Sequence, residues 1–600
     1  MPRARNEPPP GIQIQDVEPQ VNCGRFPVKR VVGEEVAVSA TIFRDGHDVL
    51  GAAVRYRPPG ARRWREAPLE PVSNDLWRGS FAVDAPGRWT FTVAAWTDRI
   101  ASWQREVTRK LEGGQTDLAG ELSEGRALLE AEISLEEGLA APSRDRDGQV
   151  ELDVKLGVDV DRELARFGSW YELFPRSWGG FAGVEKVVPR LAELGFDVVY
   201  LPPIHPIGRT NRKGRNNAVT AKRGDVGSPW AIGGEEGGHT GINPDLGTLA
   251  DFERLVARAR DVGVEIALDY AIQCSPDHPW LKEHPEWFHR RPDGTLKYAE
   301  NPPKKYQDIY NVNFQSEDWR GLWNALRDVM LYWIEHGVRV FRVDNPHTKP
   351  VPFWEWLIAE VRHVEPNIVL LSEAFTRPAM MTTLAKAGFS QSYTYFTWKN
   401  TKAELEELMA QILEWRDYYR PNFFANTPDI LHEYLQRGGR PAFEARLVLA
   451  ATLSPSYGIY SGFEHCENVP VSEGSEEYLD SEKYEVKKRK LDGPLLPLVQ
   501  RLNEIRRTEP ALQRVDNLHW LETEQERVVA YIKDDVVVVV NIDPLASHEG
   551  LAIVPAALGL PPTFFARDLL GGERYRWSIG RNFVRLDPGQ AHIFKLETHV

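Results

Sequence analysis

The sequence predicts a multidomain α/β protein in which a central (β/α)8 barrel is flanked by an N-terminal β-sandwich and a C-terminal all-β domain. Its 600 residues are too many for one hydrophobic core, because single cores stop growing at roughly 250–300 residues. Helical stretches alternate with apolar strands in the middle of the chain, whereas both ends show strand-like alternation. The expected parts are a disordered lead-in (1–15), the β-sandwich (16–115), a short helical segment with a linker (116–160), the barrel with a loop insertion near 205–250 (161–505), and the C-terminal β domain (506–600).

The N-terminal region is predicted to be a β-sandwich because apolar and polar residues alternate in "EEVAVSATIF" and "RWTFTVAAW", with the turn-like "RDGHD" and "APGR" between them. Residues 117–138 then predict an acidic helix. The stretch "APSRDRDGQ", which follows, is typical of a linker.

The middle of the chain predicts a barrel because three helical stretches end at a glycine and run directly into an apolar strand. The junctions are "LAELGFDVVYL" at Gly195, "ARDVGVEIALD" at Gly263 and "YWIEHGVRVFRVD" at Gly337. Glycine suits the left-handed position that follows a helix. No G-x-G-x-x-G follows the first strand, which favours a barrel over a doubly wound sheet. Further strands are expected at residues 169–174, 368–371, 422–425 and 458–461.

The last hundred residues are predicted to be all-β. "RVVAYIKDDVVVVVNI" is typical of a hairpin and "DLLGGERYRW" of a turn between strands. The five consecutive valines at 536–540 indicate a buried strand.

Composition excludes several classes of protein. No apolar run approaches the ~18 residues of a membrane span, and no apolar stretch follows the positive start "MPRAR", as a secretory signal would require. A net charge of −14 disfavours binding to nucleic acid or to anionic membranes. Three cysteines distant in sequence argue against a disulfide framework and for a reducing compartment. We therefore expect a cytoplasmic protein with neither nucleic-acid nor membrane partners.

Three acidic residues follow predicted barrel strands, where the strand ends form the active face of such a barrel. Asp344 ends "VRVFRVD", Glu373 ends "IVLLSE" and Asp429 follows "NFFANTPD". Arg342 lies two residues before Asp344, on the same face of the strand. Paired carboxylates are what glycosidic chemistry needs, one as nucleophile and one as proton carrier. The alternative is that each acid is an ion-pair or turn residue at a strand end.

A basic segment suggests that the substrate carries a phosphate. "RTNRKGRNNAVTAKR", residues 209–223, holds six basic residues and no acidic one. It follows the strand "DVVYLPPI" and should lie on the active face, where cationic groups pair well with phosphate. Lys304 and Tyr306 in "PPKKYQ" and the amide of Asn345 add donors. A solvated basic loop is the alternative interpretation.

Several of these segments resemble the α-amylase superfamily. "FRVDNPH", "LLSEAF", "NTPD" and "IALDYAIQC" are similar to its catalytic segments. The resemblance is closer to one of its families, the α-1,4-glucan:maltose-1-phosphate maltosyltransferases, through "SWYELFPRS", "YLPPIHPIGRTNRKGRNN", "CSPDHPWLKEHPEWF", "PPKKYQDIYNVNF", "EAFTRP" and "YGIYSGFEHCENVP". These segments extend from about residue 168 to 485.

The resemblance implies a role for each catalytic residue. Asp344 would be the nucleophile, Glu373 the general acid/base, and Asp429 the carboxylate that holds sugar hydroxyls in the transition state, with Arg342 orienting Asp344. Lys213, Gln273, Lys304, Tyr306 and Asn345 would hold the phosphate, and Lys483 and Tyr484 would contact the donor sugar. His347 is a further candidate for substrate contact, whereas His239 and His278 are interpreted as structural.

The implied activity is retaining transfer of maltosyl from α-maltose 1-phosphate to the non-reducing 4-hydroxyl of an α-1,4-glucan or maltooligosaccharide. No cofactor and no metal are expected. Gln273-Cys274 stands where the superfamily's hydrolases usually carry Asn-His, which weakens the case for a calcium site of amylase type. The alternatives are another α-glucan hydrolase or transglycosylase of the superfamily, and a catalytically inactive glucan-binding protein. The family's homodimer is expected here, although the helical segment near 117–160, which helps to build that dimer, looks short.

Overall fold

The computed structural model describes residues 11–301 and 304–597, and it leaves the side chains of Asn301 and Lys304 undescribed. Most of the predicted lead-in, residues 1–15, therefore lies outside the described residues. Two compact units make up the chain, Met1–Arg162 and Glu163–Val600.

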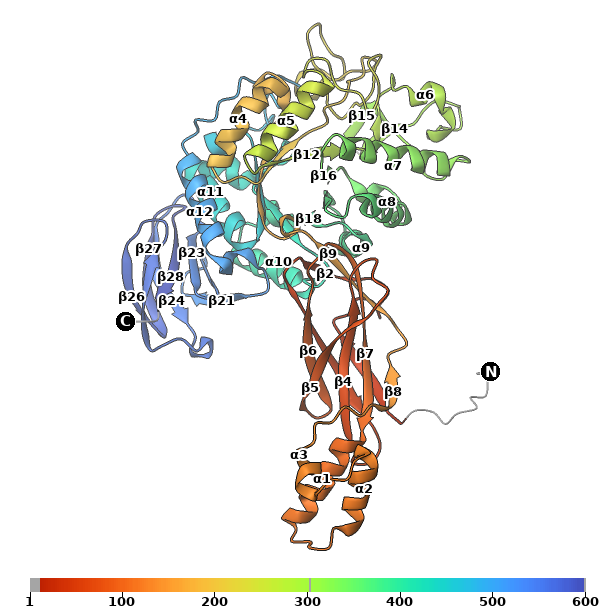
Figure 1. The fold of residues 1–600 in the computed structure, drawn as a ribbon. Helices are drawn as coiled ribbons and strands as arrows, with labels where there is room; N and C mark the ends of the chain where they lie inside the picture. The colour runs from red at the N-terminus through yellow and green to blue at the C-terminus, as the bar shows by residue number, and fades with distance from the viewer. Residues whose placement is uncertain (1–10, 302–303, 598–600) are drawn as a thin grey trace. The chain divides into compact units, whose positions relative to one another are not determined.

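The first unit consists mainly of antiparallel strands (Figure 1). Its strands pair in the order β1-β3-β6-β5-β4-β7-β9-β2, with β8 beside β7, and β2 and β9 run parallel. The strands are β1 (Gln13–Glu18), β2 (Val28–Val31), β3 (Glu35–Phe43), β4 (Val49–Arg57), β5 (Arg65–Ser73), β6 (Leu76–Ala82), β7 (Gly87–Asp98), β8 (Asp147–Glu151) and β9 (Leu156–Asp161).

Two features of this unit differ from the prediction. The single helix expected over 117–138 is two helices, and a third precedes them: α1 (Arg99–Glu112), α2 (Ala119–Leu129) and α3 (Leu135–Ala140). Strands β8 and β9 lie in the stretch expected to be helical segment and linker. The sequence pattern gave no sign of β8 because that strand has no apolar alternation. Its pairing with β7 defines it as a strand.

The second unit contains a closed barrel of parallel strands, as predicted (Figure 1). The strands in order are β10 (Gly168–Glu172), β11 (Val198–Leu201), β12 (Glu265–Tyr270), β16 (Val340–Val343), β17 (Val369–Ser372), β18 (Gln391–Tyr393), β19 (Pro421–Phe424) and β20 (Ser456–Tyr460). Gly195, Gly263 and Gly337 have φ values of 85°, 77° and 94°. The three predicted helix-to-strand junctions are therefore confirmed.

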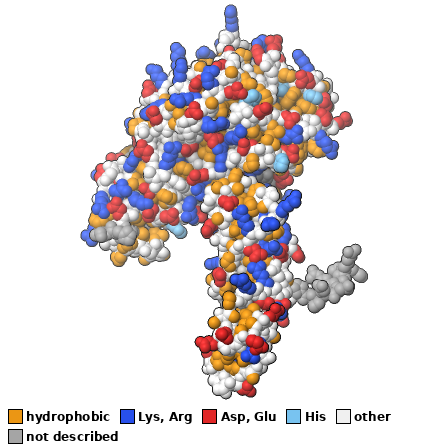
Figure 2. Space-filling model, in the orientation of Figure 1, with side chains coloured by type: hydrophobic (Ala, Val, Ile, Leu, Met, Phe, Trp, Pro, Cys, Tyr) orange, Lys and Arg blue, Asp and Glu red, His pale blue; other side chains and the backbone are white. Residues whose placement is uncertain are grey.

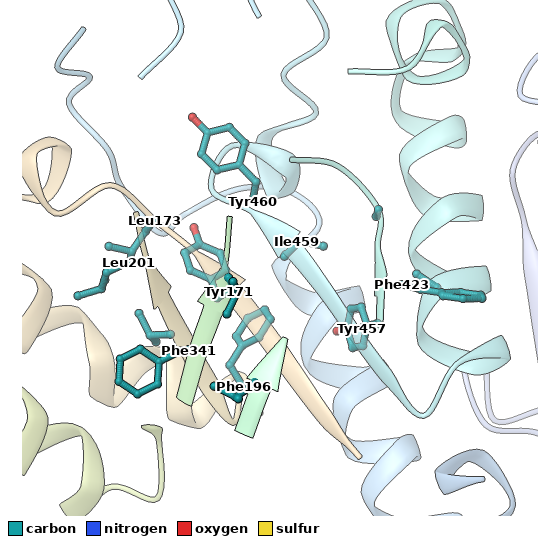
Figure 3. Packing of buried hydrophobic residues seen from close by; sticks show 14 of the residues in the cluster. Tyr171, Leu173, Phe196, Leu201, Phe341, Phe423, Tyr457, Ile459 and Tyr460 are labelled. Carbon is teal, nitrogen blue, oxygen red and sulfur yellow. The ribbon is translucent and has the colours of Figure 1, made fainter. Parts of the chain in front are cut away.

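Side chains alternate between the two faces of the barrel wall. Trp170, Tyr200 and Val340 belong to a cluster formed by inward-facing strand residues. Tyr171, Phe341 and their outward-facing neighbours pack instead with the surrounding helices, and Figure 3 shows part of that larger cluster. Because the strand period is two, residues two positions apart share a face. The last inward-facing residues of the strands therefore form the floor of the barrel mouth.

Helices surround the barrel in the second unit. They are α4 (Phe181–Glu193), α5 (Leu249–Asp261), α6 (Trp280–Glu283), α7 (Trp319–Glu335), α8 (Val351–Val364), α9 (Pro378–Ala387), α10 (Lys402–Glu414), α11 (Glu433–Leu453) and α12 (Leu496–Thr508). A small antiparallel sheet extends from the barrel mouth after β12. Its strands are β13 (Gln273–Cys274), β14 (Tyr298–Asn301) and β15 (Lys304–Asn311).

The C-terminal strands form an all-β domain that packs on the barrel helix α11. The predicted hairpin is confirmed, since β22 and β23 pair antiparallel across Asp534. The hydroxyls of Thr452 on α11 and Tyr531 on β22 lie 2.5 Å apart. The strands are β21 (Leu518–Thr523), β22 (Val528–Lys533), β23 (Val536–Asn541), β24 (His548–Val554), β25 (Thr563–Asp568), β26 (Arg574–Ser578), β27 (Gly580–Leu586) and β28 (Ala591–Glu597).

The visible surface carries Lys, Arg, Asp and Glu side chains intermixed (Figure 2). Among the described residues, no helix combines the length and the apolar character needed to cross a bilayer.

Candidate active site

Asp344 follows strand β16 directly and is bound to Arg342, which lies two residues earlier. Nη1 of Arg342 donates to Oδ1 of Asp344 at 2.7 Å and to Oδ2 of Asp269 at 2.9 Å. Asp344 and Arg342 are both buried. Burial opposes ionisation of Asp344, but the charges of Arg342 and Lys349 outweigh it and hold the pKa of Asp344 below its ordinary value. Asp344 is therefore a carboxylate aimed into the barrel mouth.

Glu373, directly after β17, shares the same guanidinium. Nη2 of Arg342 lies 2.5 Å from Oε1 of Glu373, and the backbone N–H of Asn345 donates to Oε2 at 3.3 Å. Burial raises the pKa of Glu373 to about 8 against the charge of Arg342, and the carboxylates of Asp344 and Asp429 add to the rise. Two neighbouring carboxyl groups with pKa values displaced in opposite directions suit one nucleophile and one proton carrier.

A turn held in a left-handed conformation places Asn345 between these two acids. Asn345 has φ 42° and ψ 52°, a region that asparagine tolerates better than most residues. The ammonium of Lys349 donates to the carbonyl oxygens of Asp344 and Asn345 at 3.3 and 3.2 Å. The Asn345 amide in turn donates to Oδ2 of Asp344 at 3.3 Å. The buried Lys349 thus fixes the backbone that orients nucleophile and amide together.

Asp429 lies past β19 and forms an ion pair with Lys483. The side chain of Asp429 is 41% exposed, which leaves it accessible to a ligand. Nζ of Lys483 lies 5.6 Å from the ring centre of Trp230 and 5.8 Å from that of Tyr484. The charge of Asp429 contributes to the raised pKa of Glu373, and all three predicted carboxylates follow barrel strands, β16, β17 and β19.

Lys213 approaches the site from the predicted basic segment. Its Nζ donates to Oε1 of Gln307 at 2.6 Å and to the carbonyl oxygen of Lys305 at 3.4 Å. Burial lowers the pKa of Lys213, while the charge of Asp308 opposes that change. Burial raises the pKa of Asp308 overall. The charges of Lys213 and Lys483 both oppose that rise. Two of the three predicted ligand-binding lysines, Lys213 and Lys483, therefore act on the same carboxyl group.

Three further predicted phosphate contacts, Gln273, Tyr306 and Lys304, lie on the small sheet. Gln273 donates its side-chain amide to Oδ2 of Asp344 and pairs with Asn311 of β15. Tyr306 lies on β15, where its ring packs on the cluster that contains Ile309. Lys304 begins β15, but its side chain lies outside the described residues.

His347 lies in the short helix that follows Asn345. Its Nδ1 atom is buried and has no hydrogen-bond partner among the described residues. Burial and the nearby charge of Lys349 lower the pKa of His347. A neutral imidazole with a free polar atom is suited to contact a ligand hydroxyl.

The structure adds four polar residues that the sequence prediction did not select. Glu172 is the last residue of β10 and Asp269 the penultimate residue of β12, and burial raises the pKa of both, that of Asp269 to about 7. Lys349 and Asp308 are the other two. Asp269 and Glu172 carry the signal already used for Asp344, a polar residue at a strand end, whereas Lys349 and Asp308 acquire their partners only through loop packing.

His239, Cys274 and His278 bring three buried ligand atoms within 4.8 Å of one another. Nδ1 of His239 lies 3.0 Å from Nε2 of His278, and Nε2 of His239 lies 2.9 Å from the carbonyl oxygen of Ala271. The backbone N–H of Trp280 donates to Nδ1 of His278 at 3.1 Å. All four ring nitrogens are therefore engaged, which favours the predicted structural interpretation of both histidines.

Comparison with known proteins identifies the family. A family model described as "Alpha-1,4-glucan:maltose-1-phosphate maltosyltransferase, domain N/S" matches residues 10–167, and one described as "GLGE, C-terminal" matches residues 520–596. The maltosyltransferase 1 of Streptomyces coelicolor is 48% identical over 97% of this chain and 94% of its own length. The chain belongs to the α-1,4-glucan:maltose-1-phosphate maltosyltransferase family. The member from Mycolicibacterium smegmatis is also 48% identical, over 98% of this chain and 97% of its own.

A solved structure extends the likeness to the fold. A maltogenic α-amylase from Thermotoga neapolitana is 20% identical and covers 73% of this chain and 100% of its own, with a TM-score of 0.57. The maltosyltransferase chain thus has the fold of α-amylases. The resemblance to the family stated from the sequence is confirmed, and the resemblance to α-amylases is confirmed as a likeness of fold.

Proposed function

We propose that this maltosyltransferase moves a maltosyl group from α-maltose 1-phosphate to the non-reducing 4-hydroxyl of an α-1,4-glucan, with release of phosphate and retention of configuration. Family membership supports the reaction, and the binding of Asp344 and Glu373 to one guanidinium supports the double displacement. A double displacement inverts the anomeric centre twice and so retains it.

In the first half-reaction, the carboxylate of Asp344 attacks the anomeric carbon of the donor. The bond from that carbon to the phosphate oxygen breaks, and phosphate leaves with the bonding electron pair. Glu373, protonated because its pKa is raised, gives its proton to the departing oxygen. Arg342 keeps Asp344 ionised and oriented. The product is a β-maltosyl ester on Asp344.

In the second half-reaction, the acceptor hydroxyl attacks the same carbon from the face that phosphate left. Glu373, now a carboxylate, takes the hydroxyl proton as the new glycosidic bond forms and the ester bond to Asp344 breaks. Asp429, paired with Lys483, holds sugar hydroxyls as charge develops at the anomeric carbon.

The phosphate is assigned to cationic, amide and hydroxyl donors on the small sheet and in the loops around the barrel mouth. Lys213 supplies a buried positive charge, and Gln273 and Asn345 supply amides that also touch the nucleophile. Tyr306 and Lys304 lie on the strand that pairs with Gln273's strand. Charge-assisted hydrogen bonds of this kind favour a departing dianion. Lys483, Tyr484 and His347 are assigned to the donor sugar.

Mass spectrometry of the Glu373→Ala variant with α-maltosyl fluoride tests the mechanism. Fluoride leaves without an acid, so the first step should proceed, and the missing base should trap the maltosyl ester on Asp344. The Asp344→Ala/Glu373→Ala double variant serves as the control and should carry no adduct. Absence of an adduct from both proteins would contradict the double displacement.

The reverse reaction separates the proposal from another α-glucan hydrolase or transglycosylase. Inorganic phosphate and maltohexaose should yield α-maltose 1-phosphate with the wild-type protein. Formation of glucose or maltose alone would favour hydrolysis, and lack of any turnover would favour a glucan-binding protein.

A cytoplasmic homodimer is the proposed state of the protein. The described cysteines Cys23, Cys274 and Cys466 are all free thiols, which accords with a reducing compartment. Sedimentation velocity at micromolar concentration tests the dimer, since a single monomeric species would contradict it.

A further inference from the structure

A cavity of about 440 Å³ is lined by residues of helices α9 and α10 and of the short helix Tyr395–Trp398. Its volume is within the roughly 300–1,000 Å³ of typical ligand sites. Tyr395, Trp398, Trp415 and Tyr419 supply aromatic walls, with Leu408 and Ile412 of α10 behind them. None of the residues assigned above to the maltosyl transfer lines this cavity.

One wall of the cavity rests on the loop that follows Glu373. The ring of Phe375 lies 5.0 Å from that of Trp398 and 6.0 Å from that of Tyr395. The Tyr395 hydroxyl donates to the carbonyl oxygen of Thr376 at 3.3 Å. Both aromatic walls are therefore packed against residues two and three positions beyond the proposed acid/base.

The same wall is tied to the loop that carries Asp429. The indole N–H of Trp398 donates to Oε1 of Glu476 at 2.8 Å. The carbonyl oxygen of Glu476 accepts the backbone N–H of Leu431, two residues past Asp429, at 2.7 Å. With its only polar atom engaged, Trp398 presents a fixed apolar face.

The rim of the cavity is polar and charged. Lys399 and Glu407 lie 3.6 Å apart across it, and the Glu407 side chain is 63% exposed. Gln411, one turn further along α10, adds an amide. Fixed aromatic faces with carboxylate, amide and ammonium groups at the edge suit a sugar, which has apolar ring faces and a belt of hydroxyls. A purely apolar ligand would leave the rim groups unused.

Along the barrel wall, the cavity and the proposed phosphate contact Gln273 lie on opposite sides of Asp344. Strands β12, β16, β17 and β18 are neighbours in that order. The proposed phosphate contact Gln273 follows β12, Asp344 follows β16, and the cavity residues Pro378 and Thr394 follow β17 and β18. The cavity thus lies apart from Gln273, where phosphate leaves and the acceptor hydroxyl enters, and a glucan segment bound in it leaves that place open.

We infer that this cavity is a second glucan-binding site, which holds glucosyl units of the acceptor chain away from its reacting end. The inference rests on the proposed transfer to a glucan. A polymer bound here has its chain ends at a raised effective concentration near Glu373, as in any two-point attachment. Short acceptors, which cannot span both places, gain nothing from the cavity.

Binding is measured first, without turnover. The Asp344→Ala protein should bind maltoheptaose in isothermal titration calorimetry, and Asp344→Ala combined with Trp415→Ala and Gln411→Ala should lose about tenfold in affinity, an effect typical of losing one good contact site. The matched control Glu414→Ala lies on the same helix, outside the cavity lining. Equal affinities for the cavity and control proteins would overturn the inference.

Kinetics then separate this site from the catalytic one. Trp415→Ala and Gln411→Ala should lower the rate of transfer to glycogen about fivefold and leave transfer to maltotetraose within twofold of wild type. Equal losses with both acceptors would assign the cavity a structural role and overturn the inference. Failure of the wild-type protein to use either acceptor would refute the proposed function instead, while the calorimetric result still decides the cavity.

Discussion

Nη2 of Arg342 lies 2.5 Å from Oε1 of Glu373. The other terminal nitrogen of the same guanidinium binds the carboxylates of Asp344 and Asp269. A single buried cation therefore faces three acids from three neighbouring barrel strands. A planar guanidinium can meet several carboxylates at once, whereas a lysine ammonium is a single point charge.

The Arg342→Lys variant should consequently be nearly inactive. Lysine keeps the charge but cannot hold three carboxylates in one geometry, and because misplacement by about 1 Å can cost ~100-fold, we expect kcat/KM for α-maltose 1-phosphate to fall by that order. Steady-state phosphate release measures the effect, with circular dichroism to show that the protein is folded. Activity within threefold of wild type would mean that Arg342 does not orient the acids.

The raised pKa of Glu373 predicts a pH-dependent stability. Between the ordinary carboxyl pKa and about 8, the folded protein keeps a proton on Glu373 that the unfolded chain has released. The folded state then binds more protons, so this group's contribution to stability falls as pH rises through that range. The Glu373→Gln variant lacks the group. The wild-type protein should therefore lose stability from pH 5 to pH 8 relative to the variant. The difference in melting temperature, variant minus wild type, should become more positive over this range, and a constant difference would contradict the raised pKa.

Lys213 should act on the phosphate and not on the sugar. In the Lys213→Met variant we expect KM for α-maltose 1-phosphate to rise about tenfold or more, the typical loss of one charge-assisted contact. Hydrolysis of α-maltosyl fluoride should change less than threefold, because the departing fluoride does not need the cationic contacts that hold a phosphate. Lys222→Met, exposed in the same basic segment, is the matched control. Equal losses with both donors would place Lys213 elsewhere in the mechanism.

Lys349 should control the ionisation of Asp344. Its ammonium lowers the pKa of Asp344 and holds the left-handed turn at Asn345. The Lys349→Met variant should lose ~10-fold in kcat, and the acidic limb of its pH–rate profile should move to higher pH. Lys349→Arg should recover part of the activity. An unmoved acidic limb would show that Lys349 serves folding alone.

Seven of the eight barrel strands were predictable from apolar runs, and three of these runs follow a helix-ending glycine. The exception, β18 (Gln391–Tyr393), has no apolar run. Gln391 is buried because its amide reaches the carbonyl oxygens of Leu164 and Ala165 and its oxygen accepts from Asn422. Such partners are distant in the sequence, so local pattern carries no sign of them.

The sequence by itself determined the barrel, the mainly β flanks and the family, and it selected the acids Asp344, Glu373 and Asp429 as catalytic candidates, since strand ends and motifs are local features. Tertiary structure alone decided that Arg342 serves three carboxylates, that Lys349 supports the Asn345 turn, and that Asp308 faces both Lys213 and Lys483. The physical reason is that pKa values and ion pairs depend on burial and on charges brought together from different strands, and distance in space is fixed only when the barrel closes.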